Sequence, residues 1–206
     1  MDIEIKKSIK PVNYKMAIDL LEKRVENVAI DNGKELIWFL EHKSIFTAGT
    51  SYKEKEIIDK SIKIFKSNRG GKITWHGPGQ IICYVVIDLK KRKKDIRKFI
   101  LAIEKTIINT LEELNIKSFN DRNNVGIWIN DNNEIKKIAA IGIRVKKWIA
   151  FHGFSINYTN TLREYEKIIP CGISNRGIIN INQIKKVSKN NILKKLEKNL
   201  LINLDY

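Results

Sequence analysis

Two cysteines could supply nucleophilic chemistry, and their surroundings in the sequence differ. Cys171 lies between Pro170 and Gly172, whereas Cys83 lies inside an apolar stretch. A free cysteine is usually a small hydrophobic residue of the core, and Cys83 fits that description. A nucleophilic cysteine needs exposure and a nearby cationic group or base. Because proline and glycine favour an irregular backbone, Cys171 is the better candidate for a nucleophile.

A glycine-rich stretch from Arg69 to Gln80 is a second candidate for chemistry. Its sequence is RGGKITWHGPGQ, with four glycines beside one arginine and one histidine. Glycines let a backbone approach a ligand closely, and Arg69, His76 and exposed amides can orient a polar or anionic group. The same letters also suit two tight turns joined by a short strand. From the pattern alone, both interpretations remain open.

Lys137 begins a third segment, KIAAIG, which ends at Gly142. A lysine at this place is either an exposed strand end or a buried amine in a site. An amine removed from water releases its proton more readily and can exchange protons near neutral pH. Since the chain has 39 lysines and arginines, position alone gives little reason to single out Lys137.

Metal and nucleotide chemistry have no support in the sequence. The histidines at positions 42, 76 and 152 are widely spaced, and there is no paired-cysteine motif, so we expect no metal site. A phosphate-binding loop and a dinucleotide fingerprint are also missing from the sequence.

The elements that must position these residues follow from hydrophobic periodicity. Apolar residues that recur every three or four positions predict helices over residues 12–27, 96–114 (capped by Asp95) and about 192–200. Apolar runs predict strands over residues 35–40, 81–89, 125–129, 137–145 and 148–158, with a hairpin turn at 130–133. Strands interspersed with helices indicate an α+β (mixed α/β) fold, which we expect to form one domain over residues 1–206.

Composition sets the remaining expectations. The formal net charge of +16 would attract acidic partners such as nucleic acid, an anionic membrane or an acidic protein. The densest basic run, Lys90–Lys94, is expected to be a solvated turn after a strand. The first residues do not resemble a signal peptide, there is no run of about 18 apolar residues, and two cysteines are too few for a disulfide framework. We expect a monomer in the reducing cytosol.

At the three candidate segments the sequence resembles the lipoyl(octanoyl) transferase family. Residues 69–80 match the motif RGG-x-x-T-x-HGPGQ, and residues 137–144 match K-[IV]-[AC]-[AS]-[IL]-G-[IV]-R. Residues 151–157 and 170–172 match an FHG strand followed by a PCG turn. Glu41-His42 with the following loop resembles an early motif of the family. The matches occur in the expected order and cover about residues 14–180.

The resemblance implies the fold of the catalytic domain of biotin and lipoate protein ligases, a mixed sheet packed by helices. It implies transfer of an octanoyl group from octanoyl-acyl carrier protein to a lysine of lipoyl domains, through a cysteine thioester, as the first step of endogenous protein lipoylation. The implied acceptors are lipoyl domains of 2-oxoacid dehydrogenase complexes and the glycine cleavage H protein. No ATP, metal or other cofactor is implied, and neither nucleic acid nor membrane is an implied partner.

The resemblance also assigns roles to residues. It implies that Cys171 and Lys137 form a catalytic dyad. The proposed chemistry also needs donors for the developing oxyanion, and His76 and the backbone amides of the glycine-rich stretch or of Gly142 are candidates. That His76 only shapes the pocket is an equal alternative. The implied substrate-contacting residues are Arg69, Gly70, Gly71, Lys72, Ile73, Thr74, Trp75, His76, Ala140, Ile141, Gly142, Gly153, Phe154 and Ser155.

The chain departs from the family pattern at four of its positions, and two other functions compete. Lys43 and Ser44 stand where prolines are usual, Trp75 where tyrosine or phenylalanine is commoner, and Ser155 where alanine is frequent. An ATP-dependent lipoate or biotin protein ligase shares the fold but needs no nucleophilic cysteine, so the PCG turn argues against it. A basic nucleic-acid-binding module would show steep salt dependence, but no recognised binding motif is present.

Overall fold

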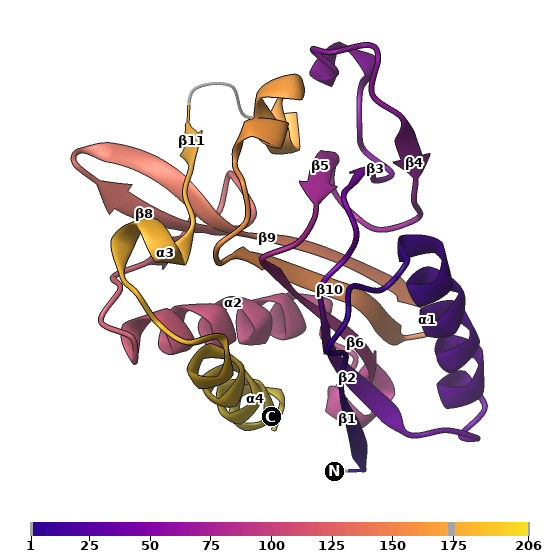
Figure 1. Cartoon of the computed structure of the whole chain (residues 1–206). Helices are drawn as coiled ribbons and strands as arrows, with labels where there is room; N and C mark the ends of the chain where they lie inside the picture. Colours follow the sequence, from indigo (N-terminus) through magenta and orange to yellow (C-terminus); the bar gives the residue numbers. More distant parts are fainter. Residues whose placement is uncertain (1, 173–175, 206) are drawn as a thin grey trace.

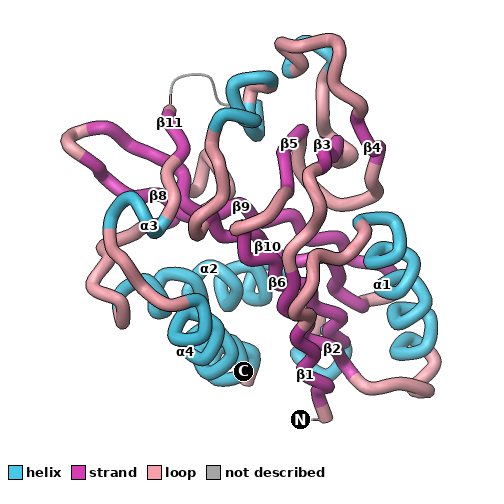
Figure 2. Tube along the Cα trace, in the orientation of Figure 1, coloured by secondary structure: helices cyan, strands magenta, loops and turns pink. Residues whose placement is uncertain are grey.

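The computed structural model describes residues 2–172 and 176–205, with Cys171 described by its backbone alone. Figures 1 and 2 show a large sheet with helices on both faces and a small sheet beside it. The strands are β1 (Ile3–Lys7), β2 (Glu35–Leu40), β3 (Ile45–Ala48), β4 (Ile64–Lys66), β5 (Ile73–His76), β6 (Gln80–Asp88), β7 (Phe119–Asn120), β8 (Ile127–Asp131), β9 (Glu134–Lys146), β10 (Ile149–Asn157) and β11 (Gly177–Ile178). The α-helices are α1 (Tyr14–Ala29), α2 (Ile96–Glu112), α3 (Ile181–Ile184) and α4 (Lys189–Leu204).

The large sheet is mixed. Its strand order is β1-β2-β6-β10-β9-β8-β7, and β11 adds to β9. The pairs β1–β2 and β11–β9 are parallel, and the others are antiparallel. The expected α+β (mixed α/β) fold is therefore confirmed, as is the hairpin of β8 and β9.

Each face of the large sheet buries a separate hydrophobic cluster, because side chains alternate along a strand. On β6, Ile81, Cys83 and Val85 pack with α2 and α4. The alternate residues Ile82 and Tyr84 pack toward α1. Cys83 is 0% exposed, which confirms it as a core residue.

The small sheet, β4-β3-β5, covers part of the face that carries α1 (Figure 1). Ile73 and Trp75 of β5 are buried in a cluster within and beneath this sheet. The segment that follows β10 contains the 3₁₀ helices η3 (Arg163–Lys167) and η4 (Pro170–Gly172), and both helices contact β5 of the small sheet. Ile57, in the loop between β3 and β4, forms a β-bridge with Ile168. This bridge joins the chain before η4 to the small sheet.

The long helices agree with the expected periodicity within a few residues. Asp95 caps α2 by accepting a hydrogen bond from the Lys98 amide, as predicted. Asn13 and Ser188 cap α1 and α4 in the same manner. No helix in the part of the chain that the structure describes is both long and apolar enough to cross a membrane.

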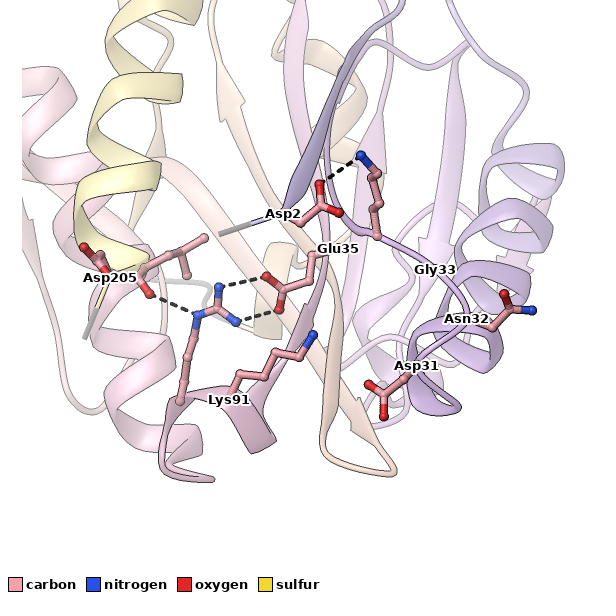
Figure 3. Close-up of a pocket in the computed structure, with 10 residues that line it drawn as sticks. Asp2, Asp31, Asn32, Gly33, Glu35, Lys91 and Asp205 are labelled. Atoms are coloured by element: carbon pink, nitrogen blue, oxygen red, sulfur yellow. Dashed lines mark hydrogen bonds and ion pairs between the residues drawn. The ribbon is translucent and has the colours of Figure 1, made fainter.

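The basic run after β6 was expected to be solvated, and for Arg92 this expectation is wrong. Arg92 is only 4% exposed, and its Nη1 and Nη2 donate to the Glu35 carboxylate at 2.6 and 2.9 Å (Figure 3). Its Nε donates to the Leu204 carbonyl at 3.0 Å. Both partners are distant from Arg92 in the sequence, so the sequence of the basic run could not predict these contacts. The bond joins the end of α4 to the large sheet.

Candidate active site

A cavity lies between β5 with its preceding loop and the β6–β10–β9 part of the large sheet. Its volume is about 50 Å³. Glycine-rich backbone forms one wall, and the sheet face that carries Ile82 and Tyr84 forms the other. The lining residues are Arg69, Gly71, Lys72, Thr74, His76, Ile82, Tyr84, Ala140, Ile141, Gly142, His152, Gly153, Phe154 and Ser155.

A smaller cavity of about 10 Å³ adjoins the first, since Thr74, Ala140 and Ser155 line both. Lys137 and Pro170 also line the smaller cavity. The residue next to Cys171 and the Lys137 side chain therefore share one space, which continues into the larger cavity. The three segments singled out in the sequence come together here.

Lys137 is a buried amine and not an exposed strand end. It is 5% exposed, and its Nζ donates to the Val125 carbonyl at 3.1 Å. The same Nζ lies 4.5 Å from the centre of the Trp128 ring. A side chain at Gly126 would crowd this amine, with its Cβ 3.3 Å from Nζ. Gly126 therefore leaves the space in which the amine lies.

Cys171 belongs to η4, and its side chain lies outside the described part of the chain. The backbone before it is fixed by hydrogen bonds to the loop after β3. The Ile169 amide donates to the Glu56 carbonyl at 2.7 Å, and the Ile58 amide donates to the Lys167 carbonyl at 3.0 Å. These contacts hold the turn at the rim of the smaller cavity.

Arg69 is a buried cation held by neutral oxygen atoms. Its Nη2 donates to the carbonyls of Thr47 and Lys72, each at 2.8 Å, and its Nη1 donates to the Gly70 carbonyl at 2.9 Å. Among the described residues, no carboxylate forms an ion pair with it. A Cβ at Gly142 would lie 3.2 Å from the Gly70 oxygen. Glycine at position 142 thus allows the Arg69 loop to approach β9.

His76 and His152 line this cavity, and the His42 ring lies 5.9 Å from that of His76. Burial is the main cause that lowers the pKa of His42 to about 4, and of His76 and His152 to about 3. The Arg69 charge lowers the pKa of His76 and His152 further. The described residues include no group of three possible ligands placed to hold a metal ion.

The tautomer of His76 follows from its neighbours. Gln80 donates through Nε2 to Asn157 at 3.0 Å and to Tyr165 at 2.8 Å, so its oxygen faces His76 at 2.7 Å. His76 Nδ1 must then carry the proton, which leaves Nε2 an acceptor. A neutral His76 in this form cannot donate to an oxyanion through Nε2. Of its two expected roles, the geometry favours shaping of the pocket.

His152 faces the cavity because its backbone is unusual. It pairs with Val85, whose side chain belongs to the opposite face of the sheet. Its φ of +66° turns the ring to the cavity face, where it stacks on Phe151 and meets Tyr84 edge-on. Its Nε2 donates to Asn68 at 2.7 Å, and its buried Nδ1 has no partner among the described residues. Such strain is typical of functional sites.

The structure separates the expected substrate-contacting residues into two groups. Most line the larger cavity, but Ile73 and Trp75 do not, because strand alternation on β5 sends them into the small-sheet cluster. Gly70 also lies behind the lining, with its carbonyl against Gly142. Sequence reasoning assigned no role to Ile82, Tyr84 or His152. Only His152 carried a signal, as part of the FHG motif.

Comparisons with known proteins give the chain's relatives. Residues 13–200 match the lipoyl protein ligase A/B catalytic domain family. The chain is 44% identical over 186 residues to an octanoyltransferase of Bartonella henselae, covering 85% of this chain and 76% of that protein. It is 40% identical over 174 residues to an octanoyltransferase of Wolbachia sp. subsp. Brugia malayi, covering 84% and 85%.

Solved structures show the same fold. A structure from a study of a bipartite lipoate protein ligase and its E2 lipoyl domain from Thermoplasma acidophilum superposes with a TM-score of 0.75 and 15% sequence identity. The match covers 99% of this chain and 84% of that chain. At this identity the likeness concerns the fold alone.

Proposed function

Because this chain belongs to the lipoyl protein ligase A/B catalytic domain family, and its close relatives are octanoyltransferases, we propose how it carries out octanoyl transfer. The enzyme moves an octanoyl group to an acceptor lysine. We propose that the donor is octanoyl-acyl carrier protein, that the acceptors are lipoyl domains, and that Cys171 and Lys137 are the reacting pair. The observation that carries this pairing is the cavity shared by Lys137 and Pro170.

The proposed reaction is two acyl transfers. The Cys171 thiolate attacks the carbonyl carbon of the donor thioester, the bond to the carrier sulfur breaks, and the carrier thiolate leaves and takes a proton. The acceptor amine then attacks the acyl-Cys171 thioester, forms the amide and loses a proton, while the Cys171 thiolate leaves. Lys137 supplies and receives the protons of the two steps. No phosphate is consumed.

We place the acyl chain in the larger cavity. It continues from the smaller cavity along β9 and β10, away from Lys137, and Ile82, Ile141 and Phe154 supply apolar walls. Arg69 adds an uncompensated positive charge at the same wall. Negative charge that develops on a bound thioester oxygen is stabilised by fixed donors and cations in a site shielded from water.

The charge of the surface around the site supports acidic protein partners. Six exposed lysines on residues 43–66 form no ion pair with any described residue. We call them the lysine rim: Lys43, Lys53, Lys55, Lys60, Lys63 and Lys66. The hydrogen bonds from residues 56–59 to residues 167–169 place this segment beside the Cys171 turn. Steering by such a surface raises encounter rates and weakens with salt.

The alternative is an ATP-dependent ligase of the same fold, and the relatives give it no better support. The two functions differ in whether they need the thiol of Cys171. A thioester mechanism requires a reduced thiol, so we propose that the enzyme works in the cytosol. A ligase would instead join free octanoate to the acceptor with ATP and would tolerate loss of the thiol.

Intact-mass spectrometry tests the proposal. The protein is incubated with octanoyl-acyl carrier protein without ATP, beside Cys171→Ala, Lys137→Met and the matched control Lys136→Met. Lys136 adjoins Lys137 but forms ion pairs with Asp131 and Glu134 outside the cavity. We expect one hydroxylamine-labile octanoyl adduct on the wild type and on K136M, discharged by an apo lipoyl domain, and none on C171A.

Lys137→Met separates the dyad from other arrangements. We expect its rates of adduct formation and discharge to fall at least 100-fold, as for loss of a general acid–base group. Transfer of free octanoate with ATP by C171A, together with no adduct on the wild type, would mean that the enzyme is a ligase.

A further inference from the structure

A second amine lies at the turn that carries Cys171. Lys72 Nζ and Glu56 Oε1 both contact the backbone at Gly172, since a Cβ built there would overlap the amine and lie 2.8 Å from the carboxylate oxygen. Nζ is therefore no more than about 4 Å from the Gly172 Cα. Because consecutive Cα atoms are about 3.8 Å apart, Nζ lies within about 8 Å of the Cys171 Cα.

The amine is held in place by Glu56. Lys72 Nζ and Glu56 Oε1 are 3.2 Å apart, and the Glu56 side chain is only 4% exposed. The other carboxylate oxygen accepts a hydrogen bond from the Lys53 amide at 3.3 Å. The Glu56 carbonyl accepts from Ile169, two residues before Cys171. Glu56 thus joins the amine, the loop after β3 and the Cys171 turn.

Lys72 also differs from Lys137 in what surrounds it. Lys137 is buried against Val125 and Trp128 and has no carboxylate partner among the described residues. Lys72 lines the larger cavity and contacts the turn as a member of an ion pair. The two lysines therefore approach the turn's cavity with different electrostatic settings.

We propose that Lys72 is a positioning residue for the nucleophile: its cationic amine, set by Glu56, holds the Cys171 turn and favours the thiolate form of Cys171. This inference rests on the proposed function, in which Cys171 is the nucleophile. It divides the work between two amines. Lys72 provides a constant positive charge for the thiolate, and Lys137 moves the protons.

The expected size of the effect follows from Coulomb's law. Taking the bound of about 8 Å to the Cys171 Cα as the separation of two unit charges, and an effective dielectric constant of about 40, the interaction corresponds to roughly one pH unit. Removing the Lys72 charge should therefore raise the midpoint of thiolate formation by about one unit. Removing the Glu56 charge should lower that midpoint, because the carboxylate opposes the thiolate.

The two substitutions are expected to shift the midpoint of thiolate formation in opposite directions, and this can be measured. The rate of alkylation by iodoacetamide is measured against pH by intact mass, for the wild type and the variants K72Q, K72R, E56Q and C171A. Cys83 gives no background, because it is fully buried and burial raises the pKa of its thiol. K63Q is the matched control, since Lys63 is an exposed lysine of the loop after β3, which also carries Glu56, and it forms no ion pair with a described residue.

We expect the alkylation midpoint to rise by about one pH unit in K72Q, to fall in E56Q, and to stay near the wild-type value in K72R and K63Q. No rise in K72Q, or shifts of K72Q and E56Q in the same direction, would show that the pair is only a structural clamp and overturn the inference. E56Q keeps the shape of the pair and carries the test by itself if K72Q does not fold. The readout uses no acyl substrate, so transfer by C171A would refute the proposed function without touching this result.

Discussion

The three buried histidines make stability depend on pH well above the range in which carboxylates titrate. In the folded protein the pKa of His42 is about 4, and the pKa of His76 and of His152 is about 3, whereas an unfolded histidine has a pKa of about 6.5. Below pH 6.5 the unfolded chain binds up to three more protons than the folded chain. The free energy of unfolding must therefore fall as the pH falls.

The magnitude can be worked out without knowing the folded pKa values closely. At pH 5 each unfolded histidine is almost fully protonated and each folded one is almost fully neutral. The linkage relation then gives a loss of about 2 kcal/mol per histidine relative to pH 8, and about 6 kcal/mol for three. At pH 6 the same sum is about 2.5 kcal/mol. A domain of ordinary stability, about 5–15 kcal/mol, would lose much of it by pH 5.

The assay is urea unfolding at pH 8, 7, 6 and 5, with fluorescence of the buried tryptophans as the signal. We expect the free energy of unfolding to fall along this curve, and a His42→Gln variant to show about one third less of the fall. A flat profile between pH 8 and 5 would refute the reasoning, because it would mean that the folded rings accept protons as readily as unfolded ones. Imidazole NMR signals that titrate near pH 6 would refute it directly.

Three further outcomes follow from the structure. Arg92→Met should lower the free energy of unfolding by about 3–5 kcal/mol, because it leaves the buried Glu35 carboxylate without its partner; urea unfolding measures this, and the double variant with Glu35→Leu should recover most of the loss. Gly153→Ala should destabilise by about 3 kcal/mol, since its Cβ would overlap the Cys83 carbonyl across the β6–β10 pair; wild-type thermal stability would contradict this. Replacing three lysines of the lysine rim with glutamate should lower kcat/KM for a protein donor at least tenfold at low salt and remove most of its salt dependence; kcat/KM measured against salt concentration checks this, and an unchanged salt dependence would contradict it.

Periodicity was sufficient to predict the large elements. The 3.6-residue pattern of α2 and the apolar run of β6 survive in the fold because each packs against a continuous core. Motif spacing was sufficient to bring the glycine-rich stretch, the Lys137 strand and the PCG turn to one cavity. The roles assigned to Cys171 and Lys137 stay predictions until the adduct is measured.

Other features depend on contacts that a local pattern cannot contain. Arg92 is buried because Glu35 and Leu204 meet it from distant parts of the chain. The edge strand β1 is short and half-buried, so its apolar signal is weak. His152 was expected in a strand, and it is in one, but its positive φ places the ring on the face that strand alternation excludes. Histidine is enriched at positive φ, but it adopts this conformation too seldom for a histidine in the sequence to predict it.

The electrostatics of the cavity are set by neutral histidine rings and by the charged side chain of Arg69. Burial keeps the histidine rings uncharged, and the Arg69 cation reinforces this for His76 and His152. Arg69 itself is satisfied by carbonyl and hydroxyl oxygens, among them both acceptors of Thr47. Its positive charge is therefore not cancelled by any described carboxylate at the cavity wall. A second cation without a carboxylate partner, such as a protonated histidine, would repel Arg69. A thioester oxygen that becomes negative has the opposite effect, because it supplies the counter-charge that Arg69 lacks. The same burial that makes the enzyme sensitive to acid thus gives its cavity a preference for a developing anion.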